Sequence, residues 1–243
     1  MAAEENNAGE EYIELCRNGD LEGVKAALLA GVDVNTRERG GYERTGLVLA
    51  LLNNHNNVVQ HLLNTEDLNV HMYGYRMTAL HAAVQGHNHE GLAMLLNFKD
   101  LGELDVNARE KYRRTPLWRA IENCSEHCIK MLLRDERVDP NIEGIQGPEY
   151  AGEHRPLILR DDLLTPLLYA VKRGVSARPL LRLLLSNPRT DPNIKDHSNW
   201  SKTALMYAVK ENKEDIVEIL LADPRVDLNT TERFERKADD ITR

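Results

Sequence analysis

Asp33-Val34-Asn35 is the first of six Asp-x-Asn triplets in a chain of 243 residues. The other five begin at Asp67, Asp105, Asp139, Asp191 and Asp227. Successive aspartates stand 34, 38, 34, 52 and 36 residues apart, so only one interval departs from the mid-to-upper thirties. A period of this length predicts a solenoid, in which each unit buries its apolar face against its neighbours.

Two further features keep the same register. A Leu-Leu pair precedes each triplet, and a threonine follows five of the six. The threonines open Thr45-Gly-Leu-Val-Leu-Ala, Thr78-Ala-Leu-His-Ala-Ala, Thr115-Pro-Leu-Trp-Arg-Ala, Thr165-Pro-Leu-Leu-Tyr-Ala and Thr203-Ala-Leu-Met-Tyr-Ala. The chain here resembles the ankyrin repeat, whose signature is Thr-Pro-Leu-His-x-Ala at a period of about 33. The resemblance covers roughly residues 11–229.

The resemblance implies one all-α domain over residues 1–243, an ankyrin-repeat solenoid of stacked helix-turn-helix units with protruding finger turns. We expect repeats at about 11–40, 41–72, 73–110, 111–145, 146–198 and 199–243. Side-chain chemistry leads to the same unit. Threonine is a preferred N-cap, and Pro116 and Pro166 follow at the first helical position, where a missing N–H costs nothing. Asp and Asn then end the second helix, because their side chains hydrogen-bond the local backbone.

Several positions depart from the family pattern. Only His81 fills the histidine position, and Gly46, Ala79 and Ala204 replace the proline. We therefore expect uneven repeat stabilities, with the second and third repeats weaker than an ideal consensus repeat. His81 is expected to be a structural hydrogen-bonding group between repeats.

The two ends lack the full pattern. The first unit, beginning near Tyr12, has no threonine box and is polar at its start, as a capping repeat is. The tail carries Phe234, Ala238 and Ile241 at helical spacing. This spacing fits a closing helix, a frayed terminus or a natural chain that continues.

Composition fits an intracellular protein. The net charge is −8, and three cysteines form an odd, sparse set that suits a reducing compartment. The first residues are small and acidic, unlike a signal peptide, and no apolar run has the length of a membrane span. We expect a monomer in the cytoplasm or nucleus.

The sequence offers little catalytic chemistry. The nearest grouping of metal-ligand types is Cys124, His127 and Cys128, with His87 and His89 one repeat earlier. Zinc needs four converging ligands, and we interpret these residues as a buried thiol and exposed turn side chains. We expect no enzyme, cofactor or metal site.

The finger turns, which run from each triplet to the next threonine, carry the functional signal. Aromatic residues stand three positions before four of the five threonines, at Tyr42, Tyr75, Tyr112 and Trp200. Arginines flank them at Arg37, Arg39, Arg44, Arg76, Arg109, Arg113 and Arg114. Tyrosine and arginine are enriched at binding hot spots. The resemblance adds Trp118, Arg119, Tyr169 and Tyr207 on or near the concave face. Alternatively, each finger aromatic packs along its own hairpin.

Charge is segregated between fingers and body. Segments 36–44, 70–77, 108–114 and 195–202 hold ten basic and four acidic residues, a surplus of six positive charges in a chain of net −8. Such a basic aromatic ridge should attract an acidic partner. The alternative is an ordinary solvated surface.

The fourth finger is longer than the others. It has 24 residues from Asn141 to Thr165, and its insert spans 143–164. Because solenoid loops carry few contacts between repeats, we predict that deleting Glu143 to Leu159 leaves the fold intact.

Together these patterns favour a non-catalytic protein-interaction module that binds an acidic or phosphorylated protein segment. Two alternatives stay open. One is a nucleotide- or oligonucleotide-sensing ankyrin domain, because the finger aromatics and arginines would suit stacking and phosphate contacts. The other is the recognition domain of a larger signalling protein.

Overall fold

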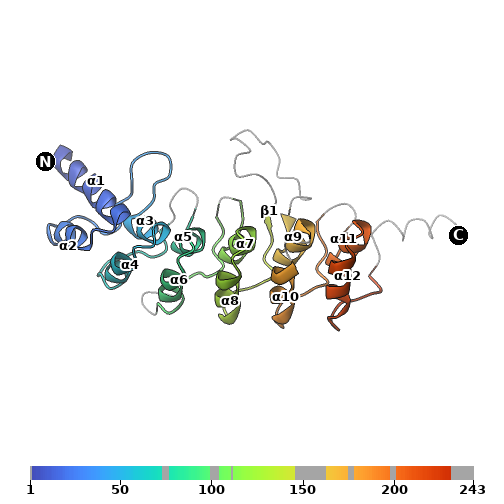
Figure 1. The fold of residues 1–243 in the computed structure, drawn as a ribbon. Coiled ribbons are helices and arrows are strands. Elements are labelled where there is room, and N and C mark those ends of the chain that lie inside the picture. The colour runs from blue at the N-terminus through green and yellow to red at the C-terminus, as the bar shows by residue number, and fades with distance from the viewer. Residues whose placement is uncertain are drawn as a thin grey trace. The chain divides into compact units, whose positions relative to one another are not determined.

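A computed structural model describes residues 2–72, 77–98, 104–110, 112–145, 163–174, 178–197 and 201–230 (Figure 1). These ranges hold twelve helices and two short strands. In chain order they are α1 (Ala2–Asn18), α2 (Leu21–Leu29), α3 (Gly46–Leu52), α4 (Asn56–Leu63), α5 (Ala79–Gln85), α6 (His89–Leu96), α7 (Pro116–Glu122), α8 (Glu126–Arg134), β1 (Gly144–Ile145), β2 (Leu163–Leu164), α9 (Pro166–Arg173), α10 (Arg178–Ser186), α11 (Ala204–Lys210) and α12 (Glu214–Leu221). The all-α repeat fold is confirmed. None of the described helices is long and apolar enough to cross a membrane.

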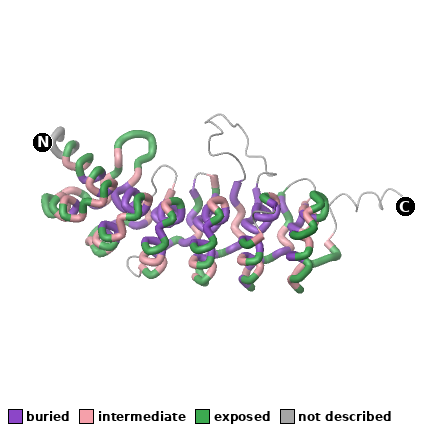
Figure 2. The backbone as a smooth tube through the Cα atoms, viewed as in Figure 1, coloured by how far each residue is buried: buried purple, intermediate pink, exposed green. Residues whose placement is uncertain are grey.

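The chain divides into two compact units, Met1–Lys111 (unit 1) and Tyr112–Arg243 (unit 2). We call the first helix of each pair the A helix and the second the B helix. In unit 1 the A helices α1, α3 and α5 pack side by side, and so do the B helices α2, α4 and α6. Unit 2 repeats this with α7, α9 and α11 against α8, α10 and α12. Buried residues concentrate where the two layers of a unit meet (Figure 2).

The threonines begin the A helices, as predicted. The hydroxyl oxygens of Thr45, Thr78, Thr115, Thr165 and Thr203 each accept the backbone N–H three residues on, at 3.2–3.4 Å. Pro116 and Pro166 occupy the first turn. An N-cap of this kind satisfies one of the four unpaired N–H groups at a helix start.

The Asp-x-Asn triplet has two roles in the structure. Its aspartate accepts the backbone N–H of the asparagine, at 2.8 Å in Asp33–Asn35, which is the local bond predicted. The asparagine side chain also reaches the next triplet. Asn35 donates to the Asp67 carbonyl at 2.7 Å and accepts from the Asn69 backbone at 2.7 Å. A similar pair of bonds joins Asn141 to the Arg189 carbonyl and the Asp191 N–H, and Asn193 to the Arg225 carbonyl and the Asp227 N–H. The regular spacing is thus maintained by one amide that bridges consecutive repeats.

Two arginines that the sequence analysis overlooked also join consecutive repeats in unit 2. Arg189 stands two residues before the fifth triplet and donates to the carbonyls of Leu133, Asp135, Glu136 and Val138 at 2.6–3.0 Å. Arg225 does the same one repeat later, with four carbonyls between Leu185 and Thr190. Each guanidinium therefore satisfies carbonyl groups at and just beyond the end of the preceding B helix.

The first repeat differs from the expectation. Its A helix begins at Ala2 rather than near Tyr12 and runs for 17 residues. Tyr12 and Cys16 are fully buried against α3, and a Cβ on Gly46 would lie 2.6 Å from the Cys16 sulfur. Glycine replaces the family's proline at position 46 because α1 approaches so closely. The weakness predicted for the second and third repeats stays a prediction. The tail from residue 231, with its proposed closing helix, lies outside the described residues.

His81 has the structural position predicted and bonds Thr78 within its own repeat, and the expected bond between repeats stays a prediction. Its side chain is fully buried, and its Nδ1 lies 2.8 Å from the Thr78 hydroxyl and accepts the Thr78 backbone N–H at 3.4 Å. Together with the threonine cap this makes a capping box at the start of α5.

Candidate interaction surface

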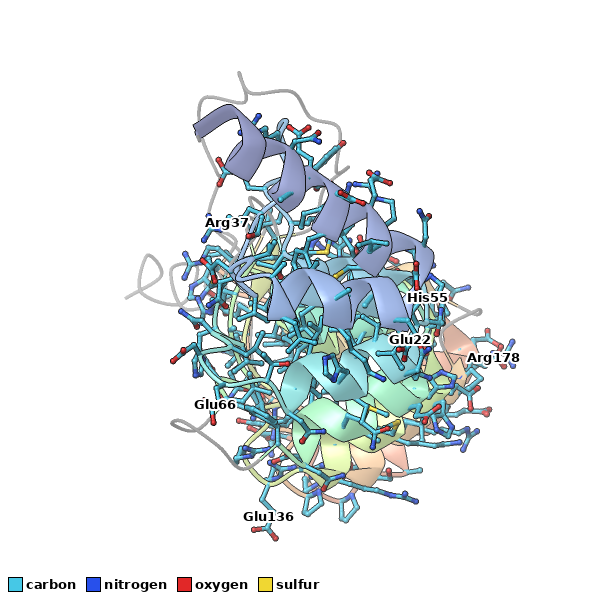
Figure 3. The ribbon with its side chains drawn as sticks, turned by 90° about the vertical axis from the view of Figure 1, so that its left-hand side faces the viewer. Glu22, Arg37, His55, Glu66, Glu136 and Arg178 are labelled. Atoms are coloured by element: carbon cyan, nitrogen blue, oxygen red, sulfur yellow. The ribbon has the colours of Figure 1, made fainter. Side chains whose placement is uncertain are left out.

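The arginines of the first finger are paired with glutamates of the same chain. Arg37 lies 3.2 Å from Glu43, and Arg39 lies 3.0 Å from Glu10 of α1. Arg44 binds Glu38, which also accepts from Arg17 at 2.8 Å. Figure 3 shows Arg37 on the side of unit 1 opposite His55, which comes from the turn between α3 and α4. The finger therefore carries less uncompensated positive charge than its sequence implied.

The finger aromatics are only partly described. Tyr75, Arg76 and Trp200 lie outside the described residues. Tyr42 is 56% exposed, with the Arg44 guanidinium 4.8 Å from its ring centroid. This contact along one hairpin agrees with the alternative in which finger aromatics pack locally.

The third finger is split between surface and core. Arg113 is exposed and Tyr112 half-buried, but Arg114 is 1% exposed. Arg114 Nε donates to the Ile145 carbonyl at 3.1 Å, and its Nη1 binds Glu122 at 2.9 Å. Arg114 therefore belongs to the core, and the expectation that it contacts a partner directly is not met.

Trp118 also lies in this core. Its side chain has no exposed surface, its ring stacks on Tyr169 with centroids 4.2 Å apart, and the Arg114 guanidinium lies 4.7 Å from its ring centroid. Its Nε1 donates to the Leu164 carbonyl at 3.2 Å. Trp118 stands where the family has histidine, and the resemblance had placed it on a binding face. The larger indole instead reaches β2 and is buried.

The base of the insert is anchored to this cluster. β1 pairs antiparallel with β2, and the Ile145 N–H donates to the Tyr112 carbonyl at 3.1 Å. A Cβ on Gly144 would lie 2.7 Å from Trp118 Nε1, so only glycine fits there. Deleting Glu143 to Leu159, which the sequence analysis predicted to leave the fold intact, would remove Gly144 and Ile145 and with them these contacts to the core. Residues 146–162 lie outside the described part.

The A helices of unit 2 carry equivalent side chains in two rows. The fourth residue of each helix gives the first row, Arg119, Tyr169 and Tyr207, and the seventh gives the second row, Glu122, Lys172 and Lys210. In α3 and α5 of unit 1 the same positions hold Leu49 and Ala82, then Leu52 and Gln85. At the fourth and seventh positions of α3, α5, α7, α9 and α11, charged and aromatic side chains therefore occur only in unit 2.

The carboxylate in these rows is paired with two arginines through one of its oxygens. Glu122 binds Arg114 and Arg119, each at 2.9 Å, and Arg119 is only 6% exposed. Arg173 extends from the end of α9, where it donates to the Ile121 and Glu122 carbonyls, and its guanidinium lies 5.8 Å from the Tyr169 ring. Burial raises the pKa of Tyr169, with a further contribution from Glu122, and Arg173 and Arg114 oppose the rise.

Tyr207 lies between two ammonium groups. Lys172 Nζ is 4.7 Å and Lys202 Nζ 5.6 Å from its ring centroid, within the range of cation–π attraction. The Tyr207 hydroxyl donates to Asp196, which also accepts the Lys202 backbone N–H at 2.8 Å. Tyr207 and Lys172 are both partly exposed.

We call the two rows, with Arg173 and with the buried side chains Arg114, Asp196 and Lys202 that contact Glu122 or Tyr207, the unit 2 surface. It brings together four residues that the sequence analysis singled out, Arg114, Arg119, Tyr169 and Tyr207, and a fifth, Trp118, lies beneath it. The lysines Lys172 and Lys210 were overlooked, although their spacing of three from Tyr169 and Tyr207 is visible in the sequence. Six basic side chains against two acidic ones leave four positive charges, and of the basic ones Lys172, Arg173 and Lys210 are at least partly exposed.

The structure offers no described grouping for metal chemistry. Among the described residues, no set of three or more His, Cys, Asp or Glu side chains could hold a metal ion. Cys124 is exposed, and burial raises the pKa of Cys128 and, to about 12, that of Cys16. The two buried thiols are therefore protonated at neutral pH and poor nucleophiles.

Comparison with known proteins agrees with this geometry. A family model of three consecutive ankyrin repeats matches residues 13–109, 75–144 and 151–232. The chain belongs to the ankyrin repeat family. Ankyrin repeats generally mediate protein–protein interaction and are typically non-catalytic.

Several ankyrin repeat proteins are similar along most of this chain. Inversin from Canis lupus familiaris is 27% identical over 219 residues, which is 89% of this chain and 18% of Inversin, and human Inversin is 26% identical with the same coverage. This chain thus spans less than a fifth of the length of these relatives. The putative ankyrin repeat protein YahD of Escherichia coli K12 is 26% identical over 89% of this chain and 96% of its own length. The crystal structure of the ankyrin repeat protein EF0377 superposes with a TM-score of 0.68 at 23% identity, covering 87% of this chain and 96% of that one.

Proposed function

We propose that this ankyrin repeat chain is a non-catalytic adaptor that binds an acidic or phosphorylated segment of a partner protein. The observation that carries the proposal is the unit 2 surface, where positive charge exceeds negative charge beside the partly exposed Tyr207 and the nearly buried Tyr169. Complementary charge steers encounter and selects partners, while tyrosine supplies contact area. The half-buried Tyr112 and the exposed Arg113 of the third finger would border the bound segment.

A nucleotide- or oligonucleotide-sensing role is the less supported alternative. Base stacking needs an open aromatic face. Trp118 has no exposed surface, and Tyr169 is 9% exposed with one face against Trp118. Tyr207 has lysines near its ring, so its faces are also partly occupied.

We also propose that the protein acts as a monomer in the cytoplasm or nucleus. Its three cysteines are free thiols, which suits a reducing compartment. Because the chain spans 18% of Inversin, a role as the recognition part of a larger signalling protein is a further proposal.

Affinity capture with the whole chain tests the function. Bait protein would be incubated with lysate that is untreated, nuclease-treated or phosphatase-treated, and bound proteins would be quantified at low and high salt. We expect a saturable protein partner that survives nuclease and is released as salt screens exposed charges over about 8–10 Å. Loss of all binding after nuclease treatment would favour the nucleic-acid alternative, and salt-independent capture would contradict the proposal.

A further inference from the structure

The burial and hydrogen bonding of the basic side chains on the unit 2 surface indicate which kind of partner it can bind. Proteins bind phosphate chiefly through arginine forks, through clustered arginines, or through the N–H groups at a helix N-terminus. A carboxylate-rich segment needs only a positive field and a few accessible ammonium groups. The two kinds of partner therefore require different surfaces.

The arginines of the unit 2 surface already have intramolecular partners. Arg114 binds Glu122 and the Ile145 carbonyl and is buried, and Arg119 binds Glu122 and is buried. Arg173 donates its Nη1 to backbone carbonyls at the end of α7. At Arg114 and Arg119 a phosphate would have to displace these bonds before it gained a bidentate contact, and at Arg173 the Nη1 is already engaged.

The helix N-termini are closed as well. Thr115, Thr165 and Thr203 cap α7, α9 and α11, and all three are at most 3% exposed. In α7 and α9 the first helical residue is proline, which has no N–H to offer. No phosphate can reach these backbone donors without unpacking the core.

What the surface does present is lysine. Lys172 is half-buried, and its ammonium group lies beside the Tyr207 ring. The hydrogen bond from Lys213, at 3.0 Å, goes to the backbone carbonyl of Lys172 and not to its side chain. Lys210 occupies the equivalent exposed position in α11. A lysine ammonium is a compact charge without a fork, so it suits single carboxylates.

Resting on the proposed function, we infer that the unit 2 surface binds an unphosphorylated, carboxylate-rich segment of a partner protein. Lys172 supplies the central charge and Tyr207 the apolar contact beneath the segment. Phosphorylation of such a segment adds negative charge, but the unit 2 surface has no specific binding site for the phosphate group. The buried arginines position Trp118 and Tyr169 and do not touch the partner.

Fluorescence anisotropy with two labelled peptides tests the inference. One peptide carries phosphoserines, and the other replaces each phosphoserine by a pair of glutamates, which matches a charge of about −2 per phosphate. We expect the two affinities to agree within about threefold, because the surface responds to charge alone. A phosphopeptide that binds about tenfold or more tightly, or failure of the glutamate peptide to bind, would overturn the inference.

Two substitutions with the same change in net charge locate the site. Lys172→Gln removes one positive charge from α9, and Gln85→Glu adds one negative charge at the equivalent exposed position of α5. We expect Lys172→Gln to weaken glutamate-peptide binding about fivefold, as for a partly exposed ion pair, and Gln85→Glu to leave it within about twofold. Equal effects would mean that net charge acts without a local site, which contradicts the inference.

The finger variant Tyr112→Ala with Arg113→Ala separates this inference from the proposed function. If that variant abolishes capture of the natural partner while Lys172→Gln has no effect, the adaptor function stands and the assignment to the unit 2 surface is wrong. If the natural partner is captured without salt dependence and neither variant matters, the proposed function itself fails.

Discussion

Replacing Trp118 by phenylalanine tests the cluster that supports the unit 2 surface. Phenylalanine keeps an aromatic ring against Tyr169 but cannot donate to the Leu164 carbonyl, which the indole Nε1 reaches at 3.2 Å. Losing a buried hydrogen bond in this way costs about 1–3 kcal/mol. The smaller ring also leaves a void, and a methyl-sized void costs about 1 kcal/mol. We therefore expect the substitution to lower the free energy of unfolding by about 2–4 kcal/mol.

Urea unfolding followed by circular dichroism measures this loss. Because repeat arrays depart from two-state behaviour, the slope and midpoint are compared together, and hydrogen exchange locates the change. Faster exchange is expected in α7, α9 and the β1–β2 pair, with α3 and α4 of unit 1 unaffected. A loss below about 0.5 kcal/mol would refute the claim that Trp118 is a buried, hydrogen-bonded anchor for the insert.

Three further outcomes concern the contacts that maintain unit 2. Arg189→Met should lower the free energy of unfolding by about 2–4 kcal/mol, since four carbonyls lose a charged donor. The control Arg182→Met, at an exposed position, should change it by no more than about 0.5 kcal/mol. Equal melting curves for the two variants would contradict this. Deleting 147–161, which leaves a two-residue turn between β1 and β2, should hardly shift the melting temperature, whereas deleting Glu143 to Leu159 should lower it by several degrees, and calorimetry on both variants decides. The Arg225 hydrogen bond lowers the pKa of Asp223 below its ordinary value of 3.8, so its stabilising effect is complete above that pH and is lost as pH falls through the folded-state value. The free energies of unfolding of wild type and Asp223→Asn, measured by denaturation at a series of pH values, should therefore converge as the pH falls below about 4. A difference that stays constant across pH would disprove the linkage.

Much of the fold could be predicted from the sequence because its determinants are local and repeated. The threonine caps, the proline positions and the aspartate of each triplet act within a few residues of themselves, so their pattern is visible in the chain. The long α1 could not be predicted in the same way, because its polar first half lacks the apolar stripe that marks the other helices. Its extent became clear only from its packing against α3.

The candidate surface was less predictable because exposure and pairing depend on residues that are distant in sequence. The sequence predicts that Arg114 is an exposed finger arginine, but it is buried and hydrogen-bonded to Glu122 and to the Ile145 carbonyl. Trp118 is buried by Leu164, which lies 46 residues away beyond the insert. Arg39 is paired with Glu10, which lies far outside its own finger. No local pattern contains these partners.

The measurement that tests the central claim most directly is amide hydrogen exchange of the whole chain with and without the glutamate peptide. We expect the bound peptide to slow exchange in the A helices α9 and α11 around Tyr169, Lys172 and Tyr207, and to leave α3 and α5 unchanged. The effect should disappear in Lys172→Gln and shrink as salt rises. Protection confined to the first finger around residues 37–44, or to the B helices α8, α10 and α12, would contradict the claim that the unit 2 surface binds the acidic segment.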